Sequence, residues 1–141
     1  MTDDVNARRA RETAFGGILA IVGSTEGHFS DEQEAETKNY IRQFILKHHP
    51  YRIITGGATG ADTWGFEIAR ELGIETVVFF PAHPRWEPNG YKERNQKIAE
   101  AATALLRIVH HKSTTYGSGW TRDEAGRIGK PTIERIVGLR P

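Results

Sequence analysis

Apolar residues in this chain gather into short runs separated by longer amphipathic segments. The first run, Ile-Leu-Ala-Ile-Val at 18–22, is continuous and ends at Gly23, which is typical of a strand covered on both faces. Glu134 and Arg135 at the centre of the last run favour an edge position in a sheet. The pattern therefore predicts five strands, at 18–22, 51–55, 74–80, 104–109 and 131–137.

Helical patterns fill the intervals between these runs. Ser30 and Gln33 have the spacing of a capping box, so they predict the start of a helix that Pro50 ends. Further helices are expected at about 61–72 and 91–102, and a fourth helix is expected to turn Thr121, Ala125 and Ile128 inward and to stop at Gly129. The segment 81–90 contains three prolines and is expected to be a loop.

The alternation of strands and helices predicts an α/β fold, a Rossmann-like doubly wound parallel sheet of about five strands. Right-handed crossovers limit the possible topologies. We favour the strand order 3-2-1-4-5, and the order 2-1-3-4-5 stays open because the sequence does not separate the two.

Composition narrows the class of protein. The 141 residues fit one domain, and we expect a flexible N-terminal tail at 1–14 and a single nucleotide-binding domain at 15–141. With 19 basic and 18 acidic residues, the chain has no electrostatic footprint for duplex DNA or a membrane surface. The absence of cysteine excludes disulfides and thiolate zinc sites. The chain has neither the apolar core of a signal peptide nor a long apolar run, which predicts a cytoplasmic protein.

The segment 53–62, Ile-Ile-Thr-Gly-Gly-Ala-Thr-Gly-Ala-Asp, carries the strongest chemical signal. A strand, a glycine-rich turn and a helix start aim backbone N–H groups and a positive helix end at one small volume, where a phosphate usually binds. Gly60 is followed by Ala61 and Asp62 instead of Lys-Ser/Thr, so the segment is not a Walker A motif. The spacing also differs from the dinucleotide fingerprint, so both a nucleoside triphosphatase and a nicotinamide dehydrogenase are disfavoured.

In the order 3-2-1-4-5, ligands bind outside the carboxyl ends of strands 1 and 4. Three loops rich in glycine, serine or threonine, at 23–24, 56–62 and 114–119, converge there. We expect a nucleotide or phosphoribosyl ligand, with no cofactor and no metal. The predicted binding residues are Gly23, Ser24, Gly56, Gly57, Thr59, Gly60, Asp62, Arg94, Gly117, Ser118 and Gly119.

Two charged residues of this set have alternative interpretations. Asp62 is more simply a helix N-cap than a group that orients a ribose hydroxyl or holds a cation, although the roles are compatible. Arg94 offers a planar fork to a phosphate or carboxylate, and pairing with Glu93 or Glu100 at the surface is equally consistent with the sequence.

Asp123 and Glu124 are expected in the first turn of the fourth helix, where acids are favoured in any protein. Either of them can instead supply the carboxylate that stabilises oxocarbenium-like charge when a sugar–base bond breaks. The candidate catalytic residues are therefore Arg94, Asp123 and Glu124.

The histidine pairs His48-His49 and His110-His111 lack the spacing of a helical metal site and are expected to be solvated. His83, Trp86 and Tyr91 flank the proline-rich loop, where they either stack on a base or hold the loop to the body. Packing is the favoured role for Trp86.

Together these residues resemble the SLOG superfamily, which includes the lonely-guy phosphoribohydrolases and the DNA-processing protein A. Gly23-Ser24 is similar to the Gly-Ser after the family's first strand, and 56–62 is similar to Gly-Gly-Ala-x-Gly-Ala-Asp of its small bacterial members of unknown role. Glu93-Arg94-Asn95 resembles the arginine motif of the third helix, whose arginine is functional in the phosphoribohydrolases. The resemblance implies nucleotide binding, a homodimer, and possible hydrolysis of the N-glycosidic bond of a nucleoside monophosphate.

The third motif departs from this pattern. The hydrolases carry Pro-Gly-Gly-x-Gly-Thr-x-x-Glu, and this chain reads Thr-Tyr-Gly-Ser-Gly-Trp-Thr-Arg-Asp at 115–123. Asp123 stands in the place of the catalytic glutamate, unless a shift of one residue brings in Glu124. The resemblance leaves two alternatives: a single-stranded nucleic-acid binder, which the neutral net charge disfavours, and a non-catalytic molybdenum-cofactor carrier.

Overall fold

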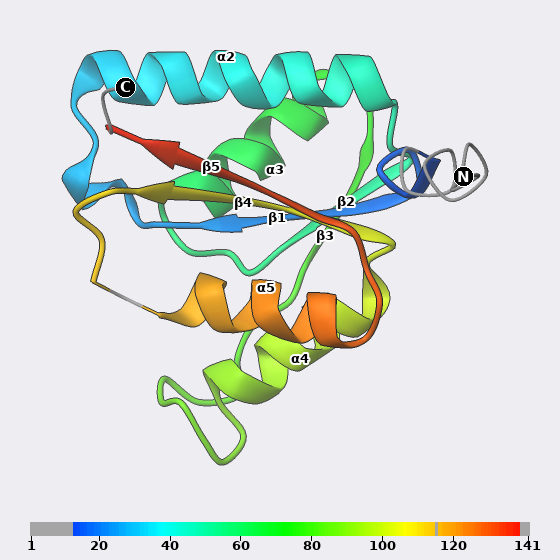
Figure 1. Cartoon of the computed structure of the whole chain (residues 1–141), viewed down its shortest axis with the longest axis vertical. Helices are drawn as coiled ribbons and strands as arrows, with labels where there is room; N and C mark the ends of the chain where they lie inside the picture. Colours follow the sequence, from blue (N-terminus) through cyan, green and yellow to red (C-terminus); the bar gives the residue numbers. More distant parts are fainter. Residues whose placement is uncertain (1–12, 115, 139–141) are drawn as a thin grey trace, which may run out of the picture.

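The computed structural model describes residues 13–114 and 116–138 as an α/β fold built on one parallel sheet (Figure 1). The strand order is β3-β2-β1-β4-β5, which confirms the predicted Rossmann-like class and the order 3-2-1-4-5, so the alternative 2-1-3-4-5 is wrong. The strands are β1 (Ile18–Gly23), β2 (Arg52–Thr55), β3 (Glu75–Val78), β4 (Ala104–His110) and β5 (Thr132–Val137).

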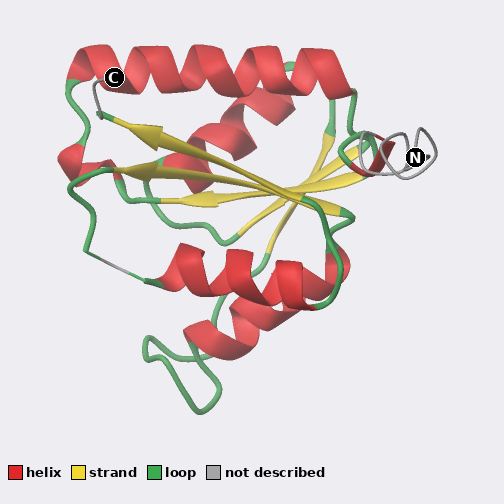
Figure 2. Ribbon diagram, in the orientation of Figure 1, coloured by secondary structure: helices red, strands yellow, loops and turns green. Residues whose placement is uncertain are grey.

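Helices cover both faces of the sheet (Figure 2). α2 (Asp31–His48) and α3 (Ala61–Glu71) lie on one face, and α4 (Tyr91–Ala101) and α5 (Gly117–Arg127) lie on the other (Figure 1). A short 3-10 helix, η1 (Glu26–His28), follows β1. Two apolar cores result, one on each side of the sheet, and the central strands β1 and β4 contribute to both. Burial on both faces explains why these strands are continuous apolar runs.

The predicted capping box at the start of α2 is confirmed. The Gln33 N–H donates to Ser30 Oγ at 3.0 Å, and the Ser30 N–H donates to Gln33 Oε1 at 3.0 Å. The helix ends at His48, two residues before Pro50.

The start of α5 differs from the prediction. Residues 117–119 were expected in a loop, but they form the first turn of the helix. The Trp120 N–H donates to the Tyr116 carbonyl at 2.8 Å, and Thr121 Oγ1 donates to the Gly117 carbonyl at 2.9 Å. These bonds close the turn despite the cost of about 1 kcal/mol per glycine in a helix. Asp123 and Glu124 consequently lie beyond the first turn, and the prediction that placed them in it is wrong.

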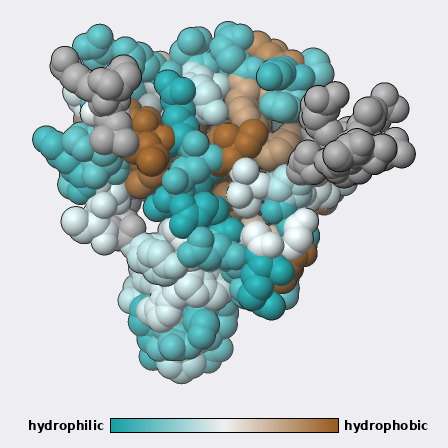
Figure 3. All heavy atoms as spheres, in the orientation of Figure 1, coloured by the Kyte–Doolittle hydropathy of each residue, from teal (hydrophilic) through white to brown (hydrophobic). Residues whose placement is uncertain are grey.

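The predicted tail at 1–14 falls mostly outside the described residues, as does Thr115. Its last residue, Ala14, packs against the core beside the buried Phe15, and the Ala14 carbonyl accepts a hydrogen bond from Thr103 Oγ1. Within the described chain, no helix is long and apolar enough to cross a membrane. The face seen in Figure 3 is largely hydrophilic, with apolar surface in small separate areas.

Candidate functional site

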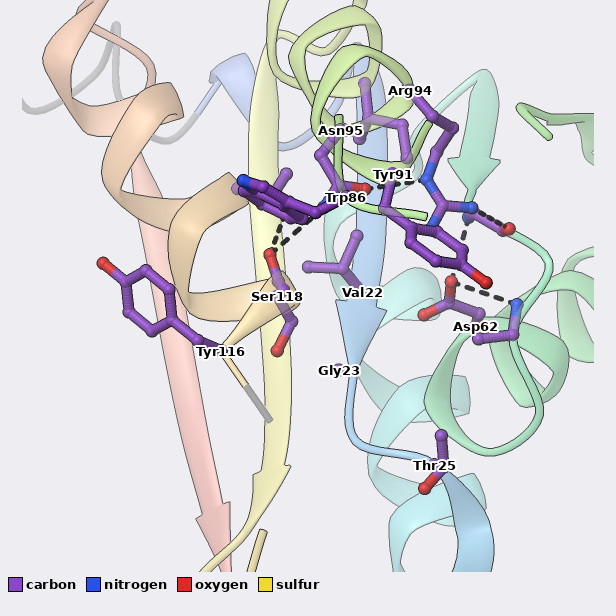
Figure 4. A pocket seen from close by; sticks show the side chains of 15 residues that line it. Val22, Gly23, Thr25, Asp62, Trp86, Tyr91, Arg94, Asn95, Tyr116 and Ser118 are labelled. Atoms are coloured by element: carbon purple, nitrogen blue, oxygen red, sulfur yellow. Dashed lines mark hydrogen bonds between the residues drawn. The ribbon is translucent and has the colours of Figure 1, made fainter. Parts of the chain in front are cut away.

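A pocket of about 620 Å³ lies at the carboxyl end of β1, between the loop that follows β2 and the start of α5. Val22 and Gly23 contribute from β1, and Asn95 and Ile98 contribute from α4. Asp62, Arg94 and Tyr91 lie on one side of the pocket, and Ser118 and Tyr116 lie on the other (Figure 4). This position matches the switch point of a doubly wound sheet, where ligands bind.

On the β2 side, the loop at 56–60, called the glycine loop below, binds a carboxylate of the protein itself. Asp62 is 5% exposed, and its Oδ2 accepts the N–H groups of Gly56 at 3.0 Å and Ala58 at 3.4 Å. The N-cap of α3 is Gly60, whose φ of 94° suits glycine, so the prediction that Asp62 is the N-cap is wrong. Asp62 lies in the first turn of α3, and its carboxylate accepts the N–H groups of the preceding loop that we expected to bind a phosphate.

Arg94 completes this wall from α4. Its Nη1 donates to the carbonyls of Gly56 and Phe79, the latter at 3.2 Å, and its Nε donates to Asn95 Oδ1 at 2.7 Å. Glu93 instead accepts the Gly90 N–H at 2.9 Å. Arg94 therefore lines the pocket, and its predicted alternative, a surface pair with Glu93 or Glu100, does not form among the described residues.

Asp62 and Arg94 affect one another electrostatically. Burial raises the pKa of Asp62 to about 6, although the N–H groups of Ala58, Gly56 and Gly23 and the charge of Arg94 oppose the rise. Burial also lowers the pKa of Arg94, and the Asp62 charge opposes that change. At neutral pH the pair is ionised, and its two charges compensate each other at the pocket wall.

The α5 side of the pocket is built differently. Gly117 and Ser118 line it at the start of the helix, which has no side-chain cap and no acidic residue in its first turn. Arg107, buried on β4, donates from Nε to Ser118 Oγ at 2.9 Å and pairs with Glu134 at 2.5 Å. The hydrogen bond from Arg107 therefore holds the first turn of α5 in place, although Arg107 itself does not line the pocket.

Several predicted binding residues do not line the pocket, and one of them, Ser24, is hydrogen-bonded within the fold. The Ser24 N–H donates to the Ile108 carbonyl at 2.9 Å, Ser24 Oγ accepts the His110 N–H at 2.9 Å, and the Ser24 carbonyl accepts the Ala61 N–H at 3.2 Å. The pocket lining in the described chain includes Gly23, Gly56, Asp62, Arg94, Gly117 and Ser118 of the predicted set, and it leaves out Ser24, Gly57, Thr59, Gly60 and Gly119.

The predicted catalytic carboxylates are not brought to the pocket. Asp123 accepts the Tyr116 hydroxyl at 2.6 Å and Arg122 Nε at 3.0 Å, and the Tyr116 bond lowers its pKa. Glu124 accepts Arg127 Nε at 2.7 Å, and this bond lowers the pKa of Glu124 to about 2. Among the residues that the structure describes, Asp62 is the one carboxylate that lines the pocket.

Aromatic side chains surround the pocket. Trp86 packs edge to face on Trp120, with ring centroids 5.5 Å apart, which agrees with the favoured packing role. It also lines the pocket, and stacking on a base stays a prediction. The Tyr91 ring lies 5.5 Å from the Arg94 guanidinium, and Tyr116 is 59% exposed. The sequence interpretation missed the lining residues Thr25, Asn95, Tyr116 and Thr121. Proximity to Gly23 and Arg94 was the available signal for Thr25 and Asn95.

The histidine prediction is wrong for His110, which is 2% exposed. Its Nδ1 accepts the Lys112 N–H at 3.1 Å, and its Nε2 lies 3.1 Å from Gln33 Oε1. His110 ends the buried run of β4, which explains its burial. No group of three possible metal ligands occurs among the described residues.

Comparison with known proteins identifies the fold. A scan against family models found no match, and a search of curated proteins found no relative. Among solved structures, the structural-genomics target TM1055 superposes with a TM-score of 0.63 at 17% identity, over 83% of this chain and 72% of its own. The molybdenum cofactor carrier protein MCP from Chlamydomonas reinhardtii gives 0.61 at 17% identity, over 84% and 75%. The chain has a SLOG-type fold.

DNA processing protein A from Streptococcus pneumoniae gives a TM-score of 0.48 at 12% identity, over 88% of this chain and 60% of its own. This similarity is too weak to support a functional conclusion. The SLOG-type fold confirms the architecture that the motifs predicted. It does not transfer a ligand at this level of identity, so the function has to be argued from the pocket.

Proposed function

We propose that this SLOG-type protein binds a nucleotide or a phosphoribosyl small molecule in the pocket beside β1. One observation supports this above the others: the uncapped N-terminus of α5 and a set of aromatic side chains face the same cavity. A volume of about 620 Å³ is within the range of small-molecule sites, about 300–1,000 Å³.

The phosphate is proposed to bind at the start of α5. Backbone N–H groups at a helix N-terminus favour an anion, and Gly117 and Ser118 present this end to the pocket. The glycine loop after β2 is the weaker candidate, because Asp62 already accepts two of its N–H groups. The proposed phosphate site is therefore the start of α5, on the wall opposite the glycine loop that the sequence predicted.

The ring and the sugar are assigned to the rest of the cavity. Trp86, Tyr91 and Tyr116 offer aromatic faces, on which a base stacks with about 1–3 kcal/mol per base. The Asp62 carboxylate is an acceptor for ribose hydroxyls, which are neutral donors.

Hydrolysis of an N-glycosidic bond has weaker support than binding. Asp123 and Glu124 are bonded to Tyr116, Arg122 and Arg127 outside the pocket, which leaves Asp62 as the carboxylate near a ligand. We expect no release of free base when the folded protein is incubated with nucleoside monophosphates. Base release that Asp62→Asn abolishes would establish an enzyme. The balanced charge of the pocket gives no support to single-stranded nucleic-acid binding.

Binding is tested by calorimetry and thermal unfolding with AMP, GMP, CMP and UMP. A ligand at 100 times its Kd stabilises a protein by about 2.7 kcal/mol. Trp86→Ala should weaken binding at least tenfold, while Tyr51→Ala, which removes a 60% exposed ring outside the pocket lining, should leave it unchanged. If no nucleotide changes the melting temperature, the proposal is wrong. The homodimer and the cytoplasmic location are further proposals, open to size-exclusion chromatography with light scattering and to cell fractionation.

A further inference from the structure

A cluster of imidazole rings lies at the carboxyl end of β4, beside the short helix η1. His28, the last residue of η1, stacks on His110 with ring centroids 5.7 Å apart, and the His111 ring lies 4.8 Å from the His110 ring. The Phe29 ring, directly after η1, packs edge to face on His110 with a centroid distance of 5.2 Å. Ring contacts centred on His110 therefore hold η1 against β4.

The hydrogen bonds of His110 fix its protonation state. Its Nδ1 accepts the Lys112 N–H at 3.1 Å, so this nitrogen carries no proton. The neutral ring then has its proton on Nε2, which donates to Gln33 Oε1 at 3.1 Å. A second proton would bind at Nδ1 and would place two N–H groups against each other, because an imidazolium is a donor at both nitrogens. The closed arrangement of the cluster therefore fits the neutral ring.

The charges around His110 act in the same direction. In the described part of the chain, the titratable side chains that face it are all basic: His28, His111 and Lys112. The groups from other elements are neutral: the Gln33 amide of α2, the Phe29 ring and the Gly138 backbone after β5. Burial lowers the pKa of His110, and the neighbouring basic groups lower it further. A proton on His110 therefore meets like charges from η1 and from the end of β4.

The cluster is connected to the pocket through the segment between β1 and η1. The His110 N–H donates to Ser24 Oγ at 2.9 Å, and the Ser24 carbonyl accepts the Ala61 N–H at the start of α3 at 3.2 Å. Thr25, the next residue, lines the pocket and directly precedes η1 (Figure 4). A movement of η1 away from His110 therefore displaces a residue of the pocket wall.

We propose that His28, His110 and His111 form a pH-sensitive switch, in which protonation of His110 releases η1 from β4 and loosens the β1 side of the pocket. In the closed state His110 is neutral and 2% exposed, and in the open state it is accessible to water and takes up one proton at Nδ1. Below the ordinary histidine pKa of about 6.5, each pH unit favours the open state by up to about tenfold, because one proton is bound. The effect on ligand binding rests on the proposed function, whereas the release of η1 does not.

The first test is NMR of the protein without ligand between pH 8 and pH 5. The ring nitrogens should show the Nε2–H tautomer of His110 at pH 8, and the amide signals of Thr25 and Gly27 should shift in acid together with the His110 ring. His110→Asn, whose amide oxygen still accepts the Lys112 N–H but does not titrate in this range, should abolish the shift. His83→Gln removes an exposed histidine from the loop at 81–90 and should leave it unchanged.

A second variant leaves His110 in place. His28 is exposed, so His28→Phe keeps a ring on His110 and removes the charge of η1 that repels it. His110 should still titrate in this variant, but the amide shifts of Thr25 and Gly27 should shrink by about threefold or more, because the like charge on η1 is gone. If the His28 ring served only for packing, His28→Phe would give the same shifts as the wild-type protein.

Calorimetry with AMP at pH 8 and pH 5.5 relates the switch to the pocket. The affinity of the wild-type protein should fall in acid by at least about threefold more than that of His28→Phe, since the like charge is present only in the former. AMP and Asp62 titrate in both proteins, so the difference between them isolates the switch.

The outcomes are distinct. A His110 ring that titrates without any shift at Thr25 and Gly27 overturns the inference, as does an acid shift that persists in both His110→Asn and His28→Phe. Equal losses of AMP affinity in the two proteins overturn the coupling to the pocket. If AMP binds at neither pH, that arm counts against the proposed function, and the NMR result still decides whether η1 is released.

Discussion

Two helices, α3 and α5, begin beside the same pocket, and among the described residues their first turns differ in charge. Both α3 and α5 follow glycine-containing segments at the carboxyl edge of the sheet. The first turn of α3 contains the Asp62 carboxylate, which accepts the N–H groups of Gly56 and Ala58 in the loop before the helix. Among the described residues, α5 has neither a side-chain cap nor an acid in its first turn. Glycine content at a strand–helix junction therefore does not by itself indicate an anion site, because one carboxylate decides whether the donors are available.

The largest effect is expected from Arg94→Ala, which leaves Asp62 buried without its opposing charge. We expect a loss of about 2–3 kcal/mol in the free energy of unfolding, below the ~3–5 kcal/mol of a fully buried pair because Arg94 is only partly buried. Urea unfolding measures it. Lys97→Ala, at an exposed position of α4, is the matched control and should change stability by less than about 0.5 kcal/mol. A similar small loss for both variants would show that the glycine loop does not depend on the pair.

Asp62 on α3 and Glu124 on α5 should make the free energy of unfolding depend on pH in opposite directions, because the pKa of Asp62 is raised and that of Glu124 is lowered. Asp62 has a pKa raised from 3.8 to about 6 in the folded state, so its contribution is fully present below pH 3.8 and is lost as the pH rises through 6. Relative to Asp62→Asn, the wild-type protein should gain about 2 kcal/mol between pH 7 and pH 4.

Glu124 on α5 is the counterpart, with a pKa lowered from 4.5 to about 2. Its contribution is present above pH 4.5 and is lost as the pH falls towards 2. Denaturant unfolding of Glu124→Gln across this range should show the opposite trend. Parallel curves for the two variants would contradict the comparison.

The two glycine segments should also differ in what they tolerate. A Cβ at Gly56 would lie 2.8 Å from Arg94 Nη1 and 2.9 Å from Asp62 Oδ2, whereas the nearest atom at Gly117 is Asn95 Nδ2 at 3.8 Å. We expect Gly56→Ala to cost about 1–3 kcal/mol. Gly117→Ala should be neutral or stabilising by up to about 1 kcal/mol, since alanine favours a helix. Thermal unfolding compares them directly, and equal losses would mean that the loop after β2 is as open as the start of α5.

The smallest change tests the comparison most directly. Ser118→Asp places a carboxylate in the first turn of α5, the position that Asp62 has in α3. Binding of AMP should fall at least tenfold, about 1.4 kcal/mol, while stability stays constant or rises because an acid favours this helix end and Arg107 is adjacent. Ser118→Asn serves as the neutral control in calorimetry. Unchanged AMP affinity in the aspartate variant would contradict the proposal that the phosphate binds at the start of α5.

The sequence was sufficient for the strands, because β1 and β4 are buried on both faces and so appear as continuous apolar runs. It favoured the observed strand order without separating it from 2-1-3-4-5. It also identified Asp62 and Arg94, which both line the pocket. It could not show that they bind the Gly56 segment, since the contact from Arg94 spans 38 residues and depends on the packing of α4.

The start of α5 was missed for a different reason. Gly117 and Gly119 have a low intrinsic helix propensity, and the helix forms there because Arg107 and Asn95 hold Ser118 and Gly117. Tyr116 lies in the segment 114–119 that the sequence placed at the pocket, but it was not singled out there as a binding residue.

The bond between Asp62 and the glycine loop has a consequence for the evolution and design of this fold. Alanine at position 62, which has no acceptor, would release the N–H groups of Gly56 and Ala58, and we expect the cavity then to offer anion-binding donors on both walls. We therefore expect one codon change at position 62 to add a second anion-binding position to the cavity. Position 62 is the first site to randomise in a library that seeks new ligands for this scaffold.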